Sequence, residues 1–156
     1  MLSLNTKAPA FRLPDQKEQF HQLKEEKGKW VVLYFYPKDD TPGCTKEACA
    51  IAEVYDEFEK LGVTVFGVSK DSPASHRKFA EKYNLPFTLL ADPSAEVIQK
   101  YGAWQEKSMY GKKYLGTARI TYIIDPRGYV AKAYPKVSPA DHALLILADL
   151  RSLLST

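Results

Sequence analysis

Trp30-Val31-Val32-Leu33-Tyr34-Phe35-Tyr36 is an unbroken run of β-branched, aromatic and other apolar residues that stops at Pro37. A run of this kind is typical of a central strand that is buried on both faces of a sheet. Pro42-Gly43 then marks the start of a helix, whose apolar residues recur at helical spacing over 51–61. A second buried strand is expected over 63–69, so this part of the chain is predicted to fold as strand, helix, strand.

The rest of the chain adds further helices and strands. The expected elements are a helix from Asp71-Ser72-Pro73 to about Tyr83, a short strand within 85–91, a helix over 93–101, a strand–turn–strand hairpin over 119–134 and a last helix from Ser138-Pro139. This order predicts an α/β fold with a mixed central sheet flanked by helices. It is consistent with a thioredoxin-like core that carries an N-terminal extension and an insertion. The 156 residues are expected to form one domain over 1–156.

The composition is that of an ordinary globular protein, with 45% apolar and 26% charged residues. The formal charge is only +3, and basic and acidic residues are mixed along the chain, so nucleic acid is not an expected partner. Residues 1–7 contain no apolar stretch typical of a signal peptide, and no stretch approaches the ~20 apolar residues of a membrane span. Two cysteines without an export signal indicate the reducing cytoplasm.

Cys44 and Cys49 are the two cysteines, and both fall at the start of the helix expected after Pro42-Gly43. A thiol at a helix N-terminus ionises more easily, because the helix dipole and the free N–H groups favour the thiolate. In an ideal helix, residues five apart have Cα atoms roughly 8.6 Å apart, whereas a disulfide tolerates at most about 7 Å. The two cysteines therefore cannot bond within one regular helix. Either the helix begins after Cys44 or it unwinds when the bond forms.

Other roles for the cysteines stay open at this point. Cys49 could be a small core residue, and the pair could form a regulatory disulfide. A metal site is not expected, because the three histidines, His21, His76 and His142, are scattered singly. The pair lacks the C-x-x-C spacing of thioredoxin-type oxidoreductases, and the chain lacks the glycine motifs of nucleotide cofactors. The adjacent carboxylates of Asp39-Asp40 are predicted to be solvated loop residues.

The residues around Cys44 resemble a known active-site signature. The pattern Pro37-x-x-x-Thr41-x-x-Cys44 is similar to that of the peroxiredoxins. The longer run Thr41-Pro42-Gly43-Cys44-Thr45-Lys46-Glu47-Ala48-Cys49 looks like the subfamily called peroxiredoxin Q, or bacterioferritin comigratory protein. The other segments that resemble this subfamily are Ala8-Pro9-Ala10-Phe11, Tyr101-Gly102-Ala103-Trp104, 109–114 and 119–125. The resemblance thus extends in order over nearly the whole chain.

The resemblance implies a role for each of five residues. Cys44 would be the nucleophile that attacks the peroxide, and Arg119 would donate hydrogen bonds to its thiolate and to the peroxide oxygen. Thr41 would offer its hydroxyl to the same two groups, Pro37 would shield the site, and Glu47 would help to orient the arginine. Each residue also has a plainer alternative: a surface charge for Arg119, a helix N-cap for Thr41, the end of a strand for Pro37 and stabilisation of the helix start for Glu47.

The reaction that the resemblance implies is reduction of hydrogen peroxide and alkyl hydroperoxides without a metal or cofactor. Cys44 would become a sulfenic acid, and Cys49 would condense with it to an intramolecular disulfide. Thioredoxin or a similar dithiol would then reduce the disulfide. This is the atypical two-cysteine type of thiol peroxidase, expected here as a cytoplasmic, monomeric enzyme of antioxidant defence.

Two alternatives of a different class remain. The chain could be a redox sensor or holdase that is switched by the disulfide, or a non-catalytic interaction module; neither needs Thr41 or Arg119. The sequence also departs from the subfamily in places. Ile120 and Tyr122 stand where Ser and Phe are common, so altered packing is expected beside Arg119. The segment 137–142 differs as well, but no effect on catalysis is expected from it.

Overall fold

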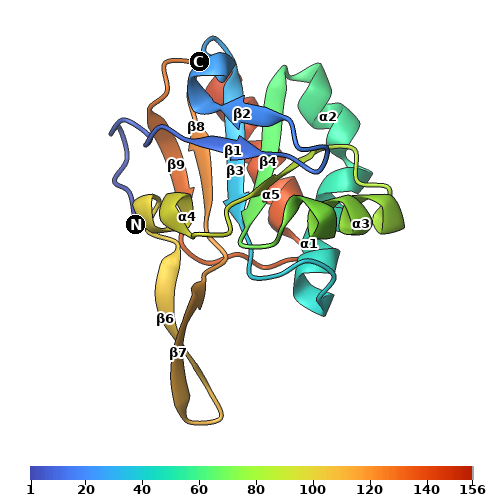
Figure 1. The fold of residues 1–156 in the computed structure, drawn as a ribbon. Helices are drawn as coiled ribbons and strands as arrows, with labels where there is room; N and C mark the ends of the chain where they lie inside the picture. Colours follow the sequence, from blue (N-terminus) through green and yellow to red (C-terminus); the bar gives the residue numbers. More distant parts are fainter. Residues whose placement is uncertain (156) are drawn as a thin grey trace.

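A five-stranded mixed sheet forms the centre of the computed structural model, which describes residues 1–155 (Figure 1). Its strand order is β5-β4-β3-β8-β9. The strands are β3 (Trp30–Phe35), β4 (Val63–Ser69), β5 (Thr88–Ala91), β8 (Thr121–Ile124) and β9 (Val130–Tyr134). The first three are parallel, whereas β8 and β9 pair antiparallel, so the expected mixed α/β sheet is confirmed.

Helices cover one face of this sheet, and the N-terminal segment with one short helix covers the other (Figure 1). The helices are α1 (Pro42–Glu53), α2 (Tyr55–Lys60), α3 (Pro73–Tyr83), α4 (Glu96–Lys100) and α5 (His142–Leu154). Alternate side chains of a strand point to opposite faces. Val32 and Tyr34 of β3 therefore pack in the core with α1, α2, α3 and α5, whereas Val31 and Leu33 pack with α4 and the N-terminal segment. Within the described residues, no helix is long and apolar enough to cross a membrane.

Several element boundaries differ from the prediction. The single helix expected up to residue 61 is two helices, because Val54 leaves the helical region at φ −115° and ψ 17°. The last helix begins at His142 rather than at Ser138, after Asp141 in the N-cap position. The short strand β5 begins only at Thr88, since Pro86 has no N–H to donate to a neighbouring strand.

Two hairpins were not predicted. The strands β1 (Arg12–Pro14) and β2 (Phe20–Gln22) pair antiparallel and lead into the 3₁₀ helix η1 (Leu23–Glu26), which together form the expected N-terminal extension. The strands β6 (Trp104–Met109) and β7 (Lys112–Thr117) form a hairpin that projects from the body (Figure 1). Tyr110 and Gly111 turn this hairpin with φ values of 54° and 76°, as two-residue hairpin turns require.

The departures from the subfamily pattern have structural consequences. The Tyr122 hydroxyl donates to the Tyr101 carbonyl at 2.6 Å and accepts from the Leu2 amide at 3.0 Å, so it ties the N-terminus to the sheet. His142 Nε2 lies 2.8 Å from the Thr121 hydroxyl, and burial lowers the pKa of His142 to about 4. The segment 137–142 therefore ends against β8, a strand that begins two residues after Arg119 in the sequence.

Candidate active site

Cys44 lies in the first turn of α1, and its side chain is buried. The first N–H groups of a helix have no partner within the helix. Pro42 has no N–H, and the Thr41 side chain makes no capping hydrogen bond although Thr41 holds the N-cap position. The amides of Gly43 and Cys44 are therefore left to interact with a negative charge at this helix end.

Arg119 contacts the sulfur of Cys44 directly. Its Nη2 donates to Cys44 Sγ at 3.1 Å, and its Nη1 approaches Glu47 Oε1 at 3.4 Å. Arg119 reaches this position because it directly precedes Ile120, whose carbonyl accepts from the amide of Phe35, the last residue of β3. The alternative of a solvated surface charge is wrong, because only 24% of the Arg119 side chain is exposed. A guanidinium is a charged hydrogen-bond donor, which suits an anionic acceptor such as a thiolate.

Gly43 is needed for this contact, a role that the sequence analysis missed. A Cβ added to Gly43 would lie 2.6 Å from Arg119 Nη2 and 3.3 Å from its Cζ. Contacts this short force the guanidinium to move. The absence of a side chain at Gly43 is therefore what lets Arg119 lie over the start of α1.

Replacing Gly43 with Ala is expected to slow the reaction of Cys44 with peroxide by about tenfold, corresponding to about 1.4 kcal/mol of lost interaction with Arg119. The helix itself is not expected to suffer, since Ala favours helix more than Gly does. Stopped-flow oxidation of the reduced protein measures the rate. Gly116→Ala is the matched control, because its new Cβ comes no closer than 3.4 Å to any neighbour, the nearest atoms being Lys107 Cδ and Tyr114 Cε2. Equal rates for Gly43→Ala and the unmodified protein would contradict the role of Gly43.

Glu47 is a buried carboxyl beneath Arg119. Its Oε2 has no hydrogen-bond partner among the described residues, and the hydroxyl of buried Tyr34 has none either. Burial raises the pKa of Glu47 from 4.5 to about 7, although the guanidinium of Arg119 opposes the rise. Burial also raises the pKa of Tyr34, and the charges of Glu47 and Cys44 add to the effect. Tyr34 therefore stays neutral beneath a carboxyl that titrates near neutral pH.

Replacing Glu47 with Gln is expected to change how stability depends on pH. The carboxyl ionises at 4.5 in the unfolded chain and at about 7 in the folded protein, so the folded state binds more protons between these values. The free energy of unfolding therefore falls as pH rises through this window, by up to about 3 kcal/mol from this group. In chemical denaturation across this window, the free energy of unfolding of the unmodified protein should fall with rising pH relative to that of Glu47→Gln.

The measurement for Glu47 is the difference between the two proteins at each pH. His142 titrates in the opposite sense over an overlapping range, because burial lowers its pKa from 6.5 to about 4. Its contribution is the same in both proteins and cancels in the difference. A difference that is constant with pH would contradict a raised pKa for Glu47.

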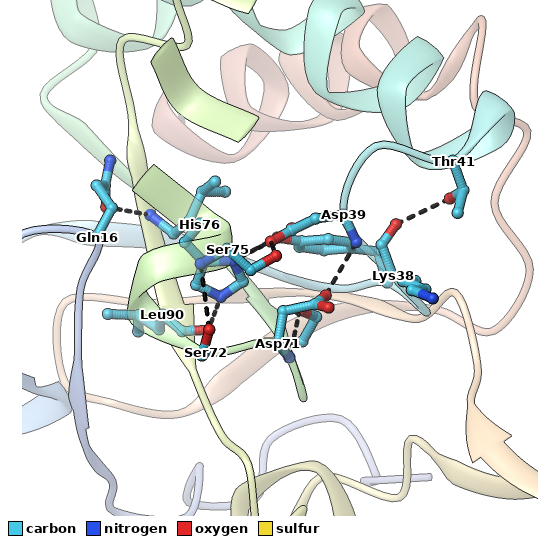
Figure 2. Close-up of polar contacts among 12 residues, drawn as sticks. Gln16, Lys38, Asp39, Thr41, Asp71, Ser72, Ser75, His76 and Leu90 are labelled. Atoms are coloured by element: carbon cyan, nitrogen blue, oxygen red, sulfur yellow. Dashed lines mark hydrogen bonds and ion pairs between the residues drawn. The ribbon is translucent and has the colours of Figure 1, made fainter. Parts of the chain in front are cut away.

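Thr41 and Pro37 lie in the loop between β3 and α1. The Thr41 hydroxyl donates to the Lys38 carbonyl at 2.8 Å and not to the sulfur (Figure 2). Its oxygen keeps lone pairs that can accept a hydrogen bond from a ligand. Pro37 follows the end of β3 by two residues and is partly exposed. The structure thus brings Cys44, Glu47 and Arg119 into contact, and it places Thr41 and Pro37 in the adjoining loop.

Cys49 lies in the same helix as Cys44, and both are free thiols. Of the two possibilities left by their spacing, α1 does not begin after Cys44, so a disulfide requires the helix to unwind. Cys49 is partly exposed and borders an open depression lined by Lys46, Ala50, Glu53 and Ala140. Burial and the charge of Glu53 raise the pKa of Cys49.

Amide hydrogen exchange is expected to be faster over residues 41–52 in the oxidised protein than in the reduced protein, because the disulfide cannot fit into the regular helix. Exchange followed by mass spectrometry of peptides gives the comparison. The amides of α3 serve as the control and should be equally protected in both states. Equal protection of residues 41–52 in the two states would contradict unwinding of α1.

Comparison with known proteins identifies the family. The AhpC/TSA family model matches residues 4–133, and the putative peroxiredoxin bcp of Coxiella burnetii is 46% identical over 149 residues, 96% of this chain and 99% of that protein. The chain is a peroxiredoxin of the AhpC/TSA family. Peroxiredoxin Bcp of Bacillus subtilis is 40% identical over 152 residues, 97% of each chain. A solved structure of Xanthomonas campestris bacterioferritin comigratory protein, studied for its alkyl peroxide reduction activity, is 38% identical with a TM-score of 0.87 and covers 92% of this chain and 91% of that chain.

The predicted resemblance to the peroxiredoxin Q subfamily is thereby confirmed. The peroxiredoxin is a thiol-dependent peroxidase with two cysteines. A second cation, Lys107 of β6, also lies near its site and was missed by the sequence analysis. Burial and the charge of Arg119 lower the pKa of Lys107, whereas the charge of Cys44 opposes this. Its position comes from the hairpin β6–β7, whose existence the sequence analysis did not predict.

The prediction that Asp39 and Asp40 are solvated loop residues is wrong for Asp39 of the peroxiredoxin and is confirmed for Asp40. Asp39 is buried, and its carboxylate accepts hydrogen bonds from Tyr36 and faces the ring of His76. Asp40 is exposed, but its carboxylate pairs with Lys82 and Tyr83 at the end of α3. Adjacent side chains point in different directions, so the two carboxylates serve different partners. The loop before Cys44 is thus anchored to α3 at two points.

Proposed function

We propose that this peroxiredoxin reduces hydrogen peroxide and organic hydroperoxides with Cys44 as the attacking thiolate. The observation that carries the proposal is the hydrogen bond from Arg119 Nη2 to Cys44 Sγ at the N-terminus of α1. The thiolate attacks one peroxide oxygen, and the O–O bond breaks. The second oxygen leaves as hydroxide or alkoxide, takes up a proton and departs as water or alcohol. Cys44 is left as a sulfenic acid.

The residues around Cys44 are proposed to prepare it and to receive the peroxide. Arg119 stabilises the thiolate and donates to the peroxide oxygen, since a guanidinium has five donors in a fixed plane. Glu47 orients Arg119 from below, at 3.4 Å. The Thr41 oxygen accepts from the peroxide O–H, because its own hydrogen is already donated to the Lys38 carbonyl. Pro37 shields the loop side of the site.

Cys49 is proposed to resolve the sulfenic acid. Its sulfur attacks the sulfur of Cys44, an S–S bond forms and the hydroxyl of the sulfenic acid leaves as water. The resulting disulfide is reduced by two thiols of an external donor, thioredoxin or a similar dithiol, which becomes a disulfide in turn. The depression beside Cys49 gives such a donor access to the bond.

The setting that fits this cycle is the cytoplasm, where dithiol donors are kept reduced. There the enzyme would serve in antioxidant defence. Because both reacting thiols belong to one chain, the cycle needs no second subunit, and we propose a monomer made of a single domain over 1–156. Organic hydroperoxides are included as substrates because the related Xanthomonas campestris protein was studied for alkyl peroxide reduction.

Stopped-flow mixing of the reduced protein with one equivalent of peroxide, followed by mass analysis, tests the proposal. The expected product is a protein that has lost two hydrogen atoms. After proteolytic digestion, mass analysis should find Cys44 and Cys49 joined by a disulfide. The same experiment is run with hydrogen peroxide and with an alkyl hydroperoxide. A protein whose two thiols stay reduced after rapid mixing with either peroxide would overturn the proposed function.

A further inference from the structure

The peptide bond between Lys38 and Asp39 is held from both of its sides (Figure 2). On one side the Lys38 carbonyl accepts from the Thr41 hydroxyl at 2.8 Å. On the other side the Asp39 amide donates to Asp71 Oδ2 at 2.9 Å. A peptide unit is planar and stiff, so its carbonyl and its amide turn together. Asp71 therefore sets the direction of the carbonyl that holds Thr41.

The side chain of Asp39 fixes the same peptide in place. Asp39 Oδ2 lies 2.7 Å from His76 Nδ1 and accepts from the Ser75 hydroxyl at 2.8 Å, while Oδ1 accepts from the Tyr36 hydroxyl at 2.6 Å. His76 is fully buried, and its Nε2 lies 2.9 Å from the Leu90 carbonyl. Because a carbonyl only accepts, the ring donates to Leu90 through Nε2, which leaves Nδ1 facing the Asp39 carboxylate.

Asp71 is itself held at the end of β4. Its Oδ2 accepts from the Ser69 hydroxyl at 2.6 Å, in addition to the Asp39 amide. The network therefore joins the region where the parallel strands β3, β4 and β5 end to the first turns of α3. None of these residues lies in α1, which must unwind for the disulfide to form. The network can thus keep its shape while α1 opens.

A cation site is the other use that these side chains suggest. Ligating atoms of Asp39, Asp71 and His76 lie within 4.8 Å of one another. Hydrogen bonds within the chain already occupy these atoms, and both ring nitrogens of His76 face protein oxygens. A cation would have to displace these bonds, so the arrangement favours a hydrogen-bonded support over a metal site.

We propose that Asp71 is a positioning residue for the Thr41 hydroxyl, acting through the Lys38–Asp39 peptide, with the Asp39–His76 pair as the fixed support of that peptide. The inference rests on the proposed function, in which Thr41 accepts from the peroxide. The Asp39 side chain anchors one end of the peptide, and loss of the Asp71 carboxylate leaves the peptide plane free to turn about that end. The Lys38 carbonyl then no longer holds the Thr41 hydroxyl in its observed direction. Peroxide reduction requires the oxygen of this hydroxyl, whereas alkylation of Cys44 by iodoacetamide does not.

A double-mutant cycle tests the inference. Asp71→Ala and Thr41→Val are each expected to slow oxidation of Cys44 by hydrogen peroxide about tenfold, the loss of one hydrogen bond of about 1.4 kcal/mol. In the Thr41→Val protein, Asp71→Ala should have almost no further effect. Alkylation of Cys44 by iodoacetamide should keep its rate in all variants. Asp71→Asn, which retains an acceptor oxygen, should recover most of the lost rate.

Asp40→Asn is the matched control, because Asp40 belongs to the same loop but pairs with Lys82 and Tyr83 instead. Its peroxide rate should be unchanged. Should Asp71→Ala not fold, Ser69→Ala removes only the hydroxyl that holds Asp71, and the same pattern is expected with a smaller loss.

Additive losses in the double variant, or equal losses of oxidation and alkylation, would overturn the positioning role while leaving the proposed function intact. Failure of the unmodified protein to react with peroxide would instead overturn the proposed function, and this inference with it.

Discussion

Replacing Cys44 with Ser is expected to abolish peroxide turnover, because a serine hydroxyl is far too weak an acid to supply the anion that attacks the O–O bond. The steady-state rate with thioredoxin as the electron donor should fall to the level of buffer alone. The substitution changes one atom in a buried site, so the protein should still fold, which a thermal unfolding curve checks. Removal of peroxide by Cys44→Ser at the native rate would show that another group carries the reaction.

Replacing Cys49 with Ser separates the two halves of the cycle. The first half remains, so one equivalent of peroxide should add one oxygen atom to Cys44, and a sulfenic-acid trap should label it. The second half is lost, so thioredoxin-linked turnover should stop after this single event. Cys49→Ser is the control for Cys44→Ser, because both replace one sulfur of α1 but only Cys44→Ser should lose the first oxidation. Continued turnover by Cys49→Ser would mean that an external thiol resolves the sulfenic acid.

Replacing Arg119 with Ala is expected to slow oxidation of Cys44 by roughly 10²–10³-fold, the effect of removing one donor from a site that stabilises developing negative charge. Arg119 is the positively charged side chain that the structure places in hydrogen-bond contact with the sulfur, at 3.1 Å. Its loss would also leave Glu47 buried without its ion-pair partner. Stopped-flow oxidation of the reduced protein measures the rate constant directly.

Arg119→Lys is the companion to the alanine variant. An ammonium keeps the charge but has no planar fork, so it cannot donate to Cys44 and Glu47 in the observed geometry. An intermediate rate is therefore expected. The arginine also separates an enzyme from a redox switch, because a switch needs the cysteines alone. A rate unchanged by Arg119→Ala would favour the switch.

Local pattern was sufficient to predict much of the fold. Strands buried on both faces are continuous apolar runs, so β3 and β4 could be recognised from residues 30–36 and 63–69. Ser72 before Pro73 predicted the start of α3, where the Ser72 hydroxyl does accept from the Ser75 amide. The hairpin β6–β7 escaped prediction because its strands are mostly exposed and carry no buried face, although Tyr110-Gly111 is a recognisable turn.

The residues of the site also divide into those whose positions the local sequence predicts and those whose positions depend on distant contacts. The position of Cys44 at a helix start follows from Pro42 and Gly43, because these residues act on the neighbouring backbone. The contact between Arg119 and Cys44 joins residues 75 positions apart, and it exists only because β8 pairs with β3. From the residues alone, Arg119 was more simply a surface charge, and only the family resemblance indicated otherwise.

Burial of polar groups was beyond the reach of the sequence, because it depends on what the rest of the chain packs around them. Asp39 seemed solvated beside Asp40, yet the end of β3 and the start of α3 enclose it with His76. Gly43 seemed only to begin a helix, yet its missing side chain makes room for Arg119. The sequence therefore determines the thiol chemistry and the helix that presents it, because both are local. The tertiary structure decides which charges and hydrogen bonds surround the sulfur, because these come from strands and helices distant in the chain.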